Sequence, residues 1–431
     1  MARRHVSRSF ATSRRNPRIS MDEVRELAEN QPTPLSLQQM KLFAAAGDKL
    51  RLVSASFLHK ELQIRFARAI MELSDLPIGL SKTASVQKAI GVYCNELLLL
   101  KGMDPPSTSE EDMAFTDAIK KAKGRGMNLV PLICGGLQEI KATDLGSNAL
   151  RLESVQEDIM HRLDTFFLSR IGIRMLIGQH VESLEQAGGR VELVNVEATV
   201  RSACQRAAKL CKKYKGQAPE VEIRLAANAS APFIYVESHL HHMVFEIVKN
   251  SMRATVEYHE GLQQKKPGRL NRLEHVMNPL SKHLGFVLPA VQEVQGVTIY
   301  PDVRNYRRPG ELPPIQIVIS QGQEDLTIKV SDEGGGVPRS KWPKIWHYDY
   351  TTSPPHPSRD SYGFHSFRQQ FSGGGYGLPI ARLFARYFGG EVTFISLEGS
   401  GSTAFIQAHR LGTKAEVVPG HATFSLQPLY S

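Results

Sequence analysis

The residues best suited to chemistry lie in one stretch, Glu237 to Glu260. Apolar side chains at helical spacing predict one buried face, and polar side chains recur at intervals of three and four on another. Glu246 and Asn250, one turn apart, suit a divalent metal that also binds phosphate. His242, one turn earlier, can orient Glu246 as a base. The alternative is a solvated helix face held by ion pairs. The polar row is His242, Glu246, Asn250 and Arg253, with Lys249 beside it.

Two glycine-rich stretches add to this pattern. The first, Asp332 to Pro338, reads DEGGGVP and follows a predicted strand. Its glycines let the backbone approach a flat ligand and Asp332 offers a carboxylate acceptor, although an ordinary strand-end turn is the alternative. The second, Gly373 to Pro379, opens an apolar helix, and unpaired N–H groups at a helix start bind anions. Pro379 suits the first turn, where no N–H is needed.

The elements that must position these residues fall into two groups. Long helices joined by short loops come first and predict a helical bundle; an array of helical repeats is the alternative, but no internal period supports it. After Gly188 and Gly189 the pattern becomes mixed. The predicted helices are 55–73, 86–100, 109–123, 128–141, 152–186, 196–213, 237–260 and 380–388. The predicted strands are 190–194, 221–225, 233–236, 315–320, 326–331, 391–396 and 403–408.

Two segments interrupt the second group. Residues 261–313 are rich in Pro, Arg and Lys, and we expect a surface excursion with some order near 284–291. Residues 342–372 form a polar loop whose length is typical of a lid or a disordered piece.

Bulk composition narrows the function classes. A chain of 431 residues suggests two domains, and the absence of a long apolar run predicts no membrane span. The formal charge of +10 includes six arginines in residues 1–20, a segment without acidic residues. This segment is typical of a mitochondrial targeting peptide cleaved after Phe10, rather than of a DNA-binding arm. Four cysteines without CxxC spacing indicate reduced thiols and no zinc site.

The order of the motifs carries a family resemblance. E-x-x-x-N on a helix, D-x-G-x-G after a strand, a long loop, a glycine-rich helix start and a G-x-T strand resemble the ATP site of the GHKL superfamily. Within it, the chain resembles the mitochondrial kinases of pyruvate and branched-chain 2-oxoacid dehydrogenases, over nearly all of residues 34–410. The insertion at 261–313 is the main departure. The phrases that carry the resemblance are PLSLQQM (34–40), SRIGIRMLIGQH (169–180), HMVFEIVKNSMRATVE (242–257), VSDEGGGVP (330–338) and GGGYGLPIARLFARYFGG (373–390).

The resemblance implies an α+β chain, with an N-terminal four-helix-type bundle followed by a GHKL (Bergerat) α/β sandwich that binds ATP. The implied domains are a targeting peptide (1–20), a regulatory and lipoyl-docking bundle (34–187), a kinase domain (188–412) with its insertion (261–313) and ATP lid (339–372), and a tail (413–431).

Residue roles follow from the same resemblance. Glu246 matches the general base and His242 the histidine that holds it; Asn250 matches the magnesium ligand, and Asp332 the acceptor of the adenine amino group. His180 is interpreted as structural or interfacial. The implied nucleotide contacts are Glu246, Lys249, Asn250, Arg253, Asp332, Gly334, Gly336, Thr351, Thr352, Gly373, Gly374, Gly375, Tyr376, Gly377, Leu378 and Thr403.

The implied function is an ATP- and Mg²⁺-dependent serine kinase of the mitochondrial matrix, which inactivates a 2-oxoacid dehydrogenase by phosphorylating its α subunit. A homodimer and recruitment by the lipoyl domain of the transacylase core are expected; nucleic acid is not an expected partner. RATVE (253–257) favours pyruvate dehydrogenase, whereas LCKKYKGQAPEVEI (210–223) is closer to the branched-chain type. The tail lacks the Asp-Trp pair by which pyruvate-type members cross over the dimer. The alternatives are a non-catalytic ATP-binding scaffold and, disfavoured by the bundle, a GHKL ATPase or chaperone.

Overall fold

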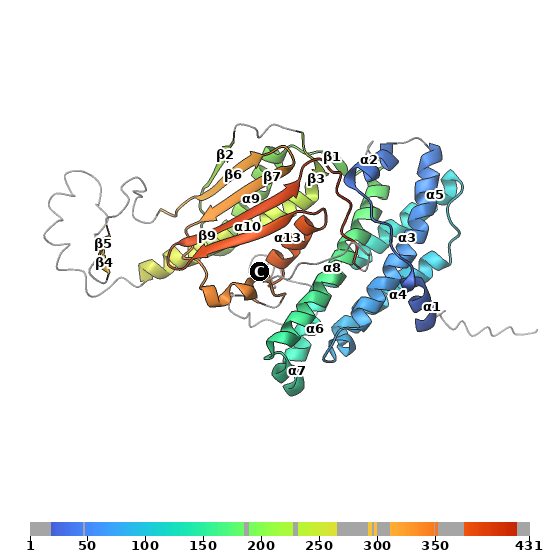
Figure 1. Ribbon diagram of the computed structural model, residues 1–431, viewed down its shortest axis with the longest axis horizontal. Coiled ribbons are helices and arrows are strands. Elements are labelled where there is room, and N and C mark those ends of the chain that lie inside the picture. The colour runs from blue at the N-terminus through green and yellow to red at the C-terminus, as the bar shows by residue number, and fades with distance from the viewer. Residues whose placement is uncertain are drawn as a thin grey trace, which may run out of the picture. The chain divides into compact units, whose positions relative to one another are not determined.

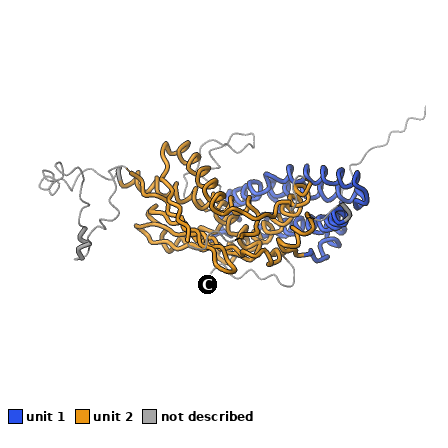
Figure 2. The backbone as a smooth tube through the Cα atoms, turned by 90° about the horizontal axis from the view of Figure 1, so that it is seen from above, with its two compact units in different colours: residues 1–33, 47–151 blue, residues 34–46, 152–431 orange. Residues whose placement is uncertain are grey.

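The computed structural model describes nine stretches of the chain, which form two compact units (Figure 2). The first unit comprises residues 1–33 and 47–151, and the second comprises residues 34–46 and 152–431. The long helix α8 (Glu153–Glu182) groups by its contacts with the second unit, whereas the sequence placed it in the bundle. The predicted domain limits stay a prediction. The described residues are 19–45, 48–184, 189–226, 232–264, 292–294, 297–299, 311–348, 350–351 and 375–419.

The first unit is helical throughout its described residues (Figure 1). The helices predicted in this part of the chain are all present, most of them with longer bounds. Helix α5 begins after Thr108, which forms a capping box with Glu111, and Pro131 lies in the first turn of α6. The helices are α1 (Met21–Glu29), α3 (Asp48–Ser74), α4 (Ala84–Lys101), α5 (Ser109–Arg125), α6 (Leu129–Lys141) and α7 (Asp144–Ala149), with 3₁₀ turns η1 (Leu80–Lys82) and η2 (Gly126–Asn128).

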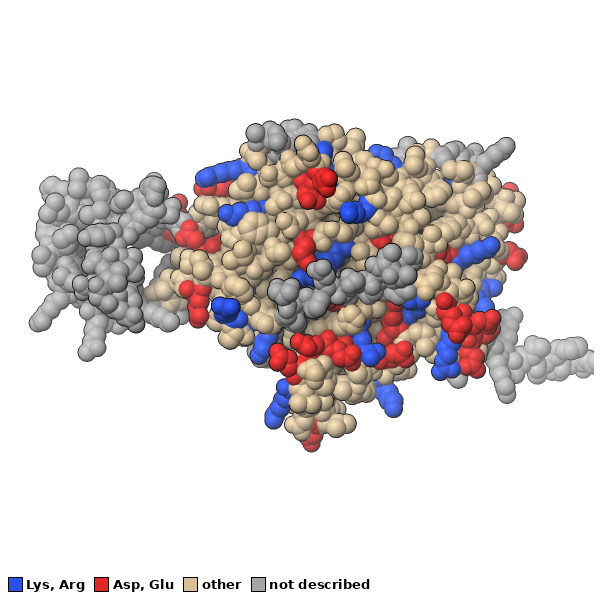
Figure 3. Space-filling view, viewed as in Figure 1, with Lys and Arg blue, Asp and Glu red and all other residues tan. Residues whose placement is uncertain are grey.

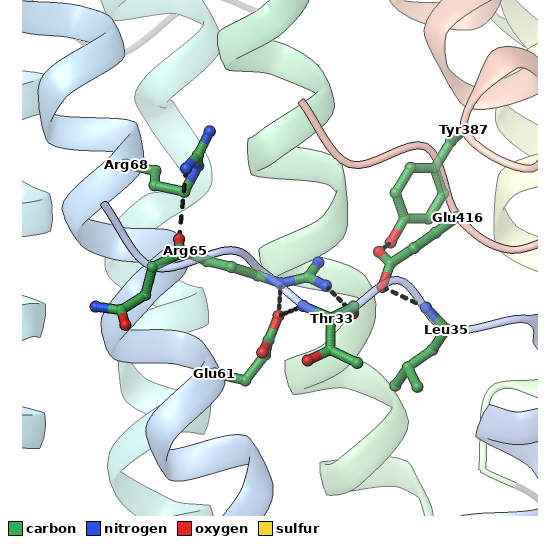
Figure 4. A network of polar contacts seen from close by, with 8 residues as sticks. Thr33, Leu35, Glu61, Arg65, Arg68, Tyr387 and Glu416 are labelled. Carbon is green, nitrogen blue, oxygen red and sulfur yellow. Dashed lines mark hydrogen bonds and ion pairs between the residues drawn. The ribbon is translucent and has the colours of Figure 1, made fainter. Parts of the chain in front are cut away.

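A buried ion pair on α3 fixes the end of the first unit's N-terminal segment (Figure 4). Arg65 Nε donates to Glu61 Oε1 at 2.8 Å, and both side chains are buried. The same carboxylate accepts the backbone N–H of Thr33 at 2.9 Å, while Arg65 donates to the Thr33 carbonyl at 3.0 Å. These backbone partners satisfy charges whose burial would otherwise destabilise the fold.

The second unit holds a mixed sheet and the helices that cover it. The predicted strands and helices of this part are confirmed within a few residues; α10 runs slightly further than predicted, and α2 is an addition. The elements are α2 (Leu37–Ala45), α8, β1 (Val191–Leu193), α9 (Val196–Lys215), β2 (Val221–Leu225), β3 (Ile234–Val236), α10 (Glu237–Gln264), β4 (Gln292–Val294), β5 (Val297–Ile299), β6 (Ile315–Gln321), β7 (Asp325–Asp332), η4 (Arg339–Lys341), η5 (Pro343–Trp346), α13 (Gly377–Arg386), β8 (Glu391–Leu397) and β9 (Gly401–His409).

The main sheet has the strand order β2-β6-β7-β9-β8. Strands β2 and β6 run parallel and the remaining neighbours antiparallel, with β6 and β7 joined as a hairpin. Alternate residues such as Ile317, Ile328 and Ile406 are buried, whereas Gln316 and Lys329 are exposed. Helices α10 and α13 contact the strands and α9 packs along α10, so helices cover one face of the sheet (Figure 1).

The N-terminal and C-terminal segments of the second unit are joined. Ser36 forms an isolated antiparallel bridge with Ala415, and the N–H of Leu35 donates to the Glu416 carboxylate at 3.2 Å. The same carboxylate accepts the hydroxyl of Tyr387, at the end of α13 (Figure 4). Both Tyr387 and Glu416 are buried. This part of the predicted tail is therefore built into the second unit.

The two interrupting segments are described in part. In the insertion, β4 and β5 form a two-stranded antiparallel sheet. The order expected near 284–291 lies outside the described residues. Of the predicted lid, the described part holds the 3₁₀ turns η4 and η5, and residues 352–372 also lie outside.

Surface and membrane properties can be stated for the part of the chain that the structure describes. No helix there combines the length and apolar character that a bilayer crossing needs. On the face drawn in Figure 3, acidic and basic side chains are interspersed rather than gathered by sign. The four cysteines, all among the described residues, are not joined in disulfides.

A buried carboxylate in α8 makes the stability of the second unit depend on pH. Asp164 accepts the hydroxyl of the fully buried Tyr348. Burial raises the pKa of Asp164 to about 6, although Tyr348, Arg386, Arg382 and His161 each act to lower it. Between about pH 4 and pH 6 the carboxyl is therefore protonated in the folded chain and ionised in the unfolded one. Unfolding releases a proton in this window, so the free energy of unfolding falls as pH rises.

Asp164→Asn is expected to remove this dependence. A shift from the ordinary value of 3.8 to about 6 corresponds to about 3 kcal/mol of stability, present below pH 4 and lost above pH 6. Urea unfolding of both proteins at pH 4 and pH 7 measures it. Relative to the variant, the wild type should lose about 3 kcal/mol between these pH values. Parallel stability curves for the two proteins would contradict the assignment.

Candidate active site

The polar row of α10 begins with a buried ion pair. Lys249 Nζ lies 2.5 Å from Glu246 Oε2, one turn apart on the same helix, and the exposed fractions of the two residues are 3% and 8%. The Lys249 ammonium also lies 5.4 Å from the centre of the Phe245 ring. A buried carboxylate without such a partner would be strongly disfavoured. Glu246 therefore lies next to a cation that can also face a phosphate.

His242 lies one turn before Glu246, as the spacing predicted. Its ring packs edge-on against Phe384 of α13, with 5.0 Å between ring centres. The Nε2 atom is buried and has no hydrogen-bond partner among the described residues. Burial lowers the pKa of His242, and the nearby Glu246 carboxylate opposes this shift only in part. The ring is therefore neutral near pH 7 and can accept or donate a hydrogen bond in the site.

The start of α13 meets the Glu246 carboxylate. The helix begins at Gly377, and Tyr376 before it supplies no side-chain cap. Pro379 lies in the first turn, as predicted, which leaves the N–H groups of Gly377 and Leu378 at the open end of the helix. A β-carbon added at Gly377 would collide with Glu246 Oε2. The glycine thus brings a helix start, which favours negative charge, into direct contact with the carboxylate.

Gly377→Ala is expected to lower the turnover rate by roughly 10- to 100-fold, because the new methyl group displaces the Glu246 carboxylate from its position. The helix itself tolerates alanine at this position, so the melting temperature should stay within a few degrees. Steady-state kinetics and thermal unfolding measure the two effects. Gly91→Ala in α4 is a matched control, because a β-carbon there meets nothing within 4 Å. Equal rates for Gly377→Ala and wild type would contradict the contact.

A second acceptor lies at the end of β7. Asp332 Oδ1 accepts the N–H of Gly334 at 3.0 Å and the N–H of Ser402 at 3.2 Å. Burial raises the pKa of Asp332, while these two donors and the hydroxyl of Ser251 lower it. Ser251 follows Asn250 on α10, so the helix that carries Glu246 also supports Asp332.

The glycines after Asp332 allow this loop to pack directly on α10. A β-carbon at Gly334 would lie 2.7 Å from Ala254 Cβ, and one at Gly335 would collide with the Tyr258 ring. Gly335 and Gly336 have φ values of +76° and +67°, which side-chain-bearing residues rarely adopt. The predicted contacts Gly334 and Gly336 are thus explained first by packing, which places Asp332 beside the polar row.

Comparison with known proteins gives two family matches. Residues 34–197 match the family described as mitochondrial branched-chain alpha-ketoacid dehydrogenase kinase. Residues 303–411 match the histidine kinase-, DNA gyrase B- and HSP90-like ATPase family. The row from His242 to Arg253 lies between the two matched ranges.

Similar proteins extend over almost the whole chain. A mitochondrial [pyruvate dehydrogenase (acetyl-transferring)] kinase of Arabidopsis thaliana is 35% identical over 94% of this chain and 97% of its own length. The human mitochondrial [pyruvate dehydrogenase (acetyl-transferring)] kinase isozyme 1 is 33% identical, over 89% of this chain and 78% of its own length. Rat isozyme 4 of this kinase is 31% identical, over 96% of this chain and 90% of its own length. This chain belongs to the mitochondrial dehydrogenase kinase family. It is a protein kinase with an ATP-binding domain of the GHKL type.

The strand register places one predicted contact away from Asp332. Thr403 lies opposite Ser331 in the β7–β9 register, and its hydroxyl is 3.0 Å from that of Ser331. Asp332 instead pairs with Ser402, whose N–H it accepts. Because side chains alternate along a strand, Thr403 points to the sheet face opposite Asp332. Ser402 is therefore the residue of β9 that lies beside Asp332, and the nucleotide contact of Thr403 stays a prediction.

Some of the remaining predicted contacts lie in the described residues and others do not. Asn250 and Arg253 lie half-buried on α10, and burial lowers the pKa of Arg253. Gly375, with φ of +85°, lies against the carbonyl of Tyr350, so the described residues on either side of 352–374 meet. Thr351 is exposed. Three predicted contacts lie outside the described residues: Thr352, Gly373 and Gly374.

The residues present fit a nucleotide with its metal ion. Like His242 Nε2, the buried hydroxyl of Tyr350 has no hydrogen-bond partner in the described part of the chain. Such atoms are open to a hydrogen bond with a ligand or with water. The described residues contain no group of three His, Cys, Asp or Glu side chains that could hold a metal alone. A magnesium ion bound at Asn250 would therefore depend on phosphate oxygens and water, as this ion commonly does.

Proposed function

We propose that this kinase transfers the γ-phosphoryl group of Mg-ATP to a serine of the α subunit of a mitochondrial 2-oxoacid dehydrogenase and thereby inactivates it. The observation that carries the proposal is the Glu246 carboxylate, held by Lys249 against the start of α13. A base, a cation and a helix start at one point are the parts that phosphoryl transfer to a hydroxyl requires. The matrix is the proposed location.

Pyruvate dehydrogenase is the favoured substrate. The three relatives described above carry this substrate in their names and match nearly the whole chain. The branched-chain 2-oxoacid dehydrogenase is the alternative, because the family matched by residues 34–197 is described by it. The proposal includes a homodimer and recruitment by the lipoyl domain of the transacylase core through residues 34–187.

In the proposed mechanism, bound Mg-ATP supplies the phosphoryl group and a metal charge that stabilises its transfer. Glu246 accepts the proton of the substrate serine as its oxygen attacks, and the neutral His242 fixes the orientation of that carboxylate. Lys249 and the start of α13 stabilise negative charge. Asn250 would hold the metal, and Asp332 accepts a hydrogen bond from the adenine amino group. The protein's contribution is thus positioning and charge stabilisation.

Phosphate transfer from γ-labelled ATP to purified pyruvate and branched-chain dehydrogenase complexes, offered side by side, tests the proposal. We expect label on the α subunit of the pyruvate dehydrogenase complex and loss of its activity in parallel. Label on the branched-chain α subunit alone would move the substrate to the alternative. Tight ATP binding with no label on either complex, both carrying intact lipoyl domains, would favour a non-catalytic scaffold.

A further inference from the structure

Tyr348 connects the residues after β7 to the long helix α8. It follows the 3₁₀ turn η5 and is fully buried. Its hydroxyl donates to the carboxylate of Asp164, and its ring lies 4.7 Å from the ring of Phe167, one turn further along α8. Tyr348 is therefore held to α8 by one polar contact and one aromatic contact.

The same short segment is held to α13. The guanidinium of Arg382 lies 4.4 Å from the centre of the Trp346 ring, and Arg382 donates to Glu391 at the start of β8 at 2.7 Å. On the other side of residues 352–374, Gly375 meets the carbonyl of Tyr350. Trp346 therefore contacts α13, and Tyr348 contacts α8. Tyr350 contacts Gly375, which lies two residues before the start of α13 at Gly377.

Burial of the ionisable Asp164 carboxyl beside Tyr348 costs free energy. Burial raises its pKa to about 6, and the Tyr348 hydroxyl, together with the nearby Arg386, Arg382 and His161, offsets this only in part. An apolar residue of the same size would satisfy α8 without that cost. Perturbed buried groups of this kind concentrate at functional sites rather than in purely structural cores.

We infer that Asp164 and Tyr348 form a positioning pair, through which α8 holds Tyr348, and with it Tyr350, against Gly375 and so sets the start of α13 at the phosphate end of the nucleotide site. This inference rests on the proposed function, because it assumes that ATP binds where α13 begins. Neither residue touches the reacting atoms. Their effect is on ATP affinity, with Glu246 and the chemical step left in place.

Tyr348→Phe is the direct test, because it keeps the ring against Phe167 and removes only the hydroxyl. The matched control is Tyr387→Phe, which removes the hydroxyl of another buried tyrosine hydrogen-bonded to a buried carboxylate, Glu416, at the far end of α13. For each protein we would measure the Kd for ATP in the absence of substrate, KM and kcat, and the melting temperature. Asp164→Asn serves as a second variant should Tyr348→Phe fail to fold.

We expect Tyr348→Phe to raise the Kd and KM for ATP on the order of tenfold with kcat within about twofold. Tyr387→Phe should lower the melting temperature comparably and leave the Kd for ATP unchanged. Equal losses of stability with unchanged Kd in both variants would overturn the inference and make the pair structural. Wild type that binds ATP without transferring phosphate would contradict the proposed function alone, since the Kd still tests the pair. Wild type that does not bind ATP would overturn both.

Discussion

Glu246→Gln is expected to lower phosphoryl transfer roughly 10²- to 10⁴-fold, the contribution typical of a general base. Glutamine has the same shape, so the contact with Gly377 is kept, but its amide cannot take the serine proton. The substitution also removes the charge partner of the buried Lys249. A phosphate group can replace that charge, so the Kd for ATP should be unchanged or lower. Single-turnover transfer of label and equilibrium ATP binding measure the two effects separately.

Glu416→Gln is the matched control for this variant. Glu416 is also a buried glutamate of the second unit, with an exposed fraction of 3% against 8% for Glu246, but its partners are Leu35 and Tyr387. Its substitution should lower stability and leave the transfer rate per folded molecule unchanged. A Glu246→Gln protein that binds ATP and transfers phosphate at the wild-type rate would remove Glu246 from the role of base.

The elements that position Glu246 could be predicted because their signals are local. The 3.6-residue period of α10 placed His242 and Glu246 on one side of the helix, and the structure keeps them there. The glycines and the proline at the start of α13 marked its first turn within a few residues. By contrast, α7 is six residues long and too short for a period, so its capping residue Thr143 was the only signal.

The features that could not be predicted depend on contacts between distant segments. Nothing near Tyr348 in the sequence indicates that its partner is Asp164 in another element. The ion pair of Glu246 with Lys249 is local, but that the start of α13 closes over it depends on the packing of two helices. Thr403 was predicted by matching the motif by residue type, whereas the pleat of β9 decides which side chain faces Asp332.

Asp332→Asn is expected to weaken ATP binding roughly 10- to 100-fold, the range that a hydrogen bond to a charged acceptor supports. The wild-type carboxylate already accepts the N–H groups of Gly334 and Ser402, which fix its orientation. Asparagine keeps an acceptor for these donors but presents its own N–H₂ to one of them or to the adenine amino group. One donor in the site is then left unpaired, at a cost close to that of the lost hydrogen bond.

Purine riboside triphosphate, which lacks the 6-amino group of ATP, separates this effect from general damage to the site. Wild type should bind this analogue roughly 10- to 100-fold more weakly than ATP, whereas Asp332→Asn should bind both with similar low affinity. Loss of discrimination, rather than loss of affinity alone, assigns Asp332 to the amino group, because misfolding weakens both ligands equally and preserves their ratio. If Asp332→Asn still prefers ATP by the wild-type factor, the carboxylate supports only the fold of the glycine loop, and the adenine must be recognised elsewhere.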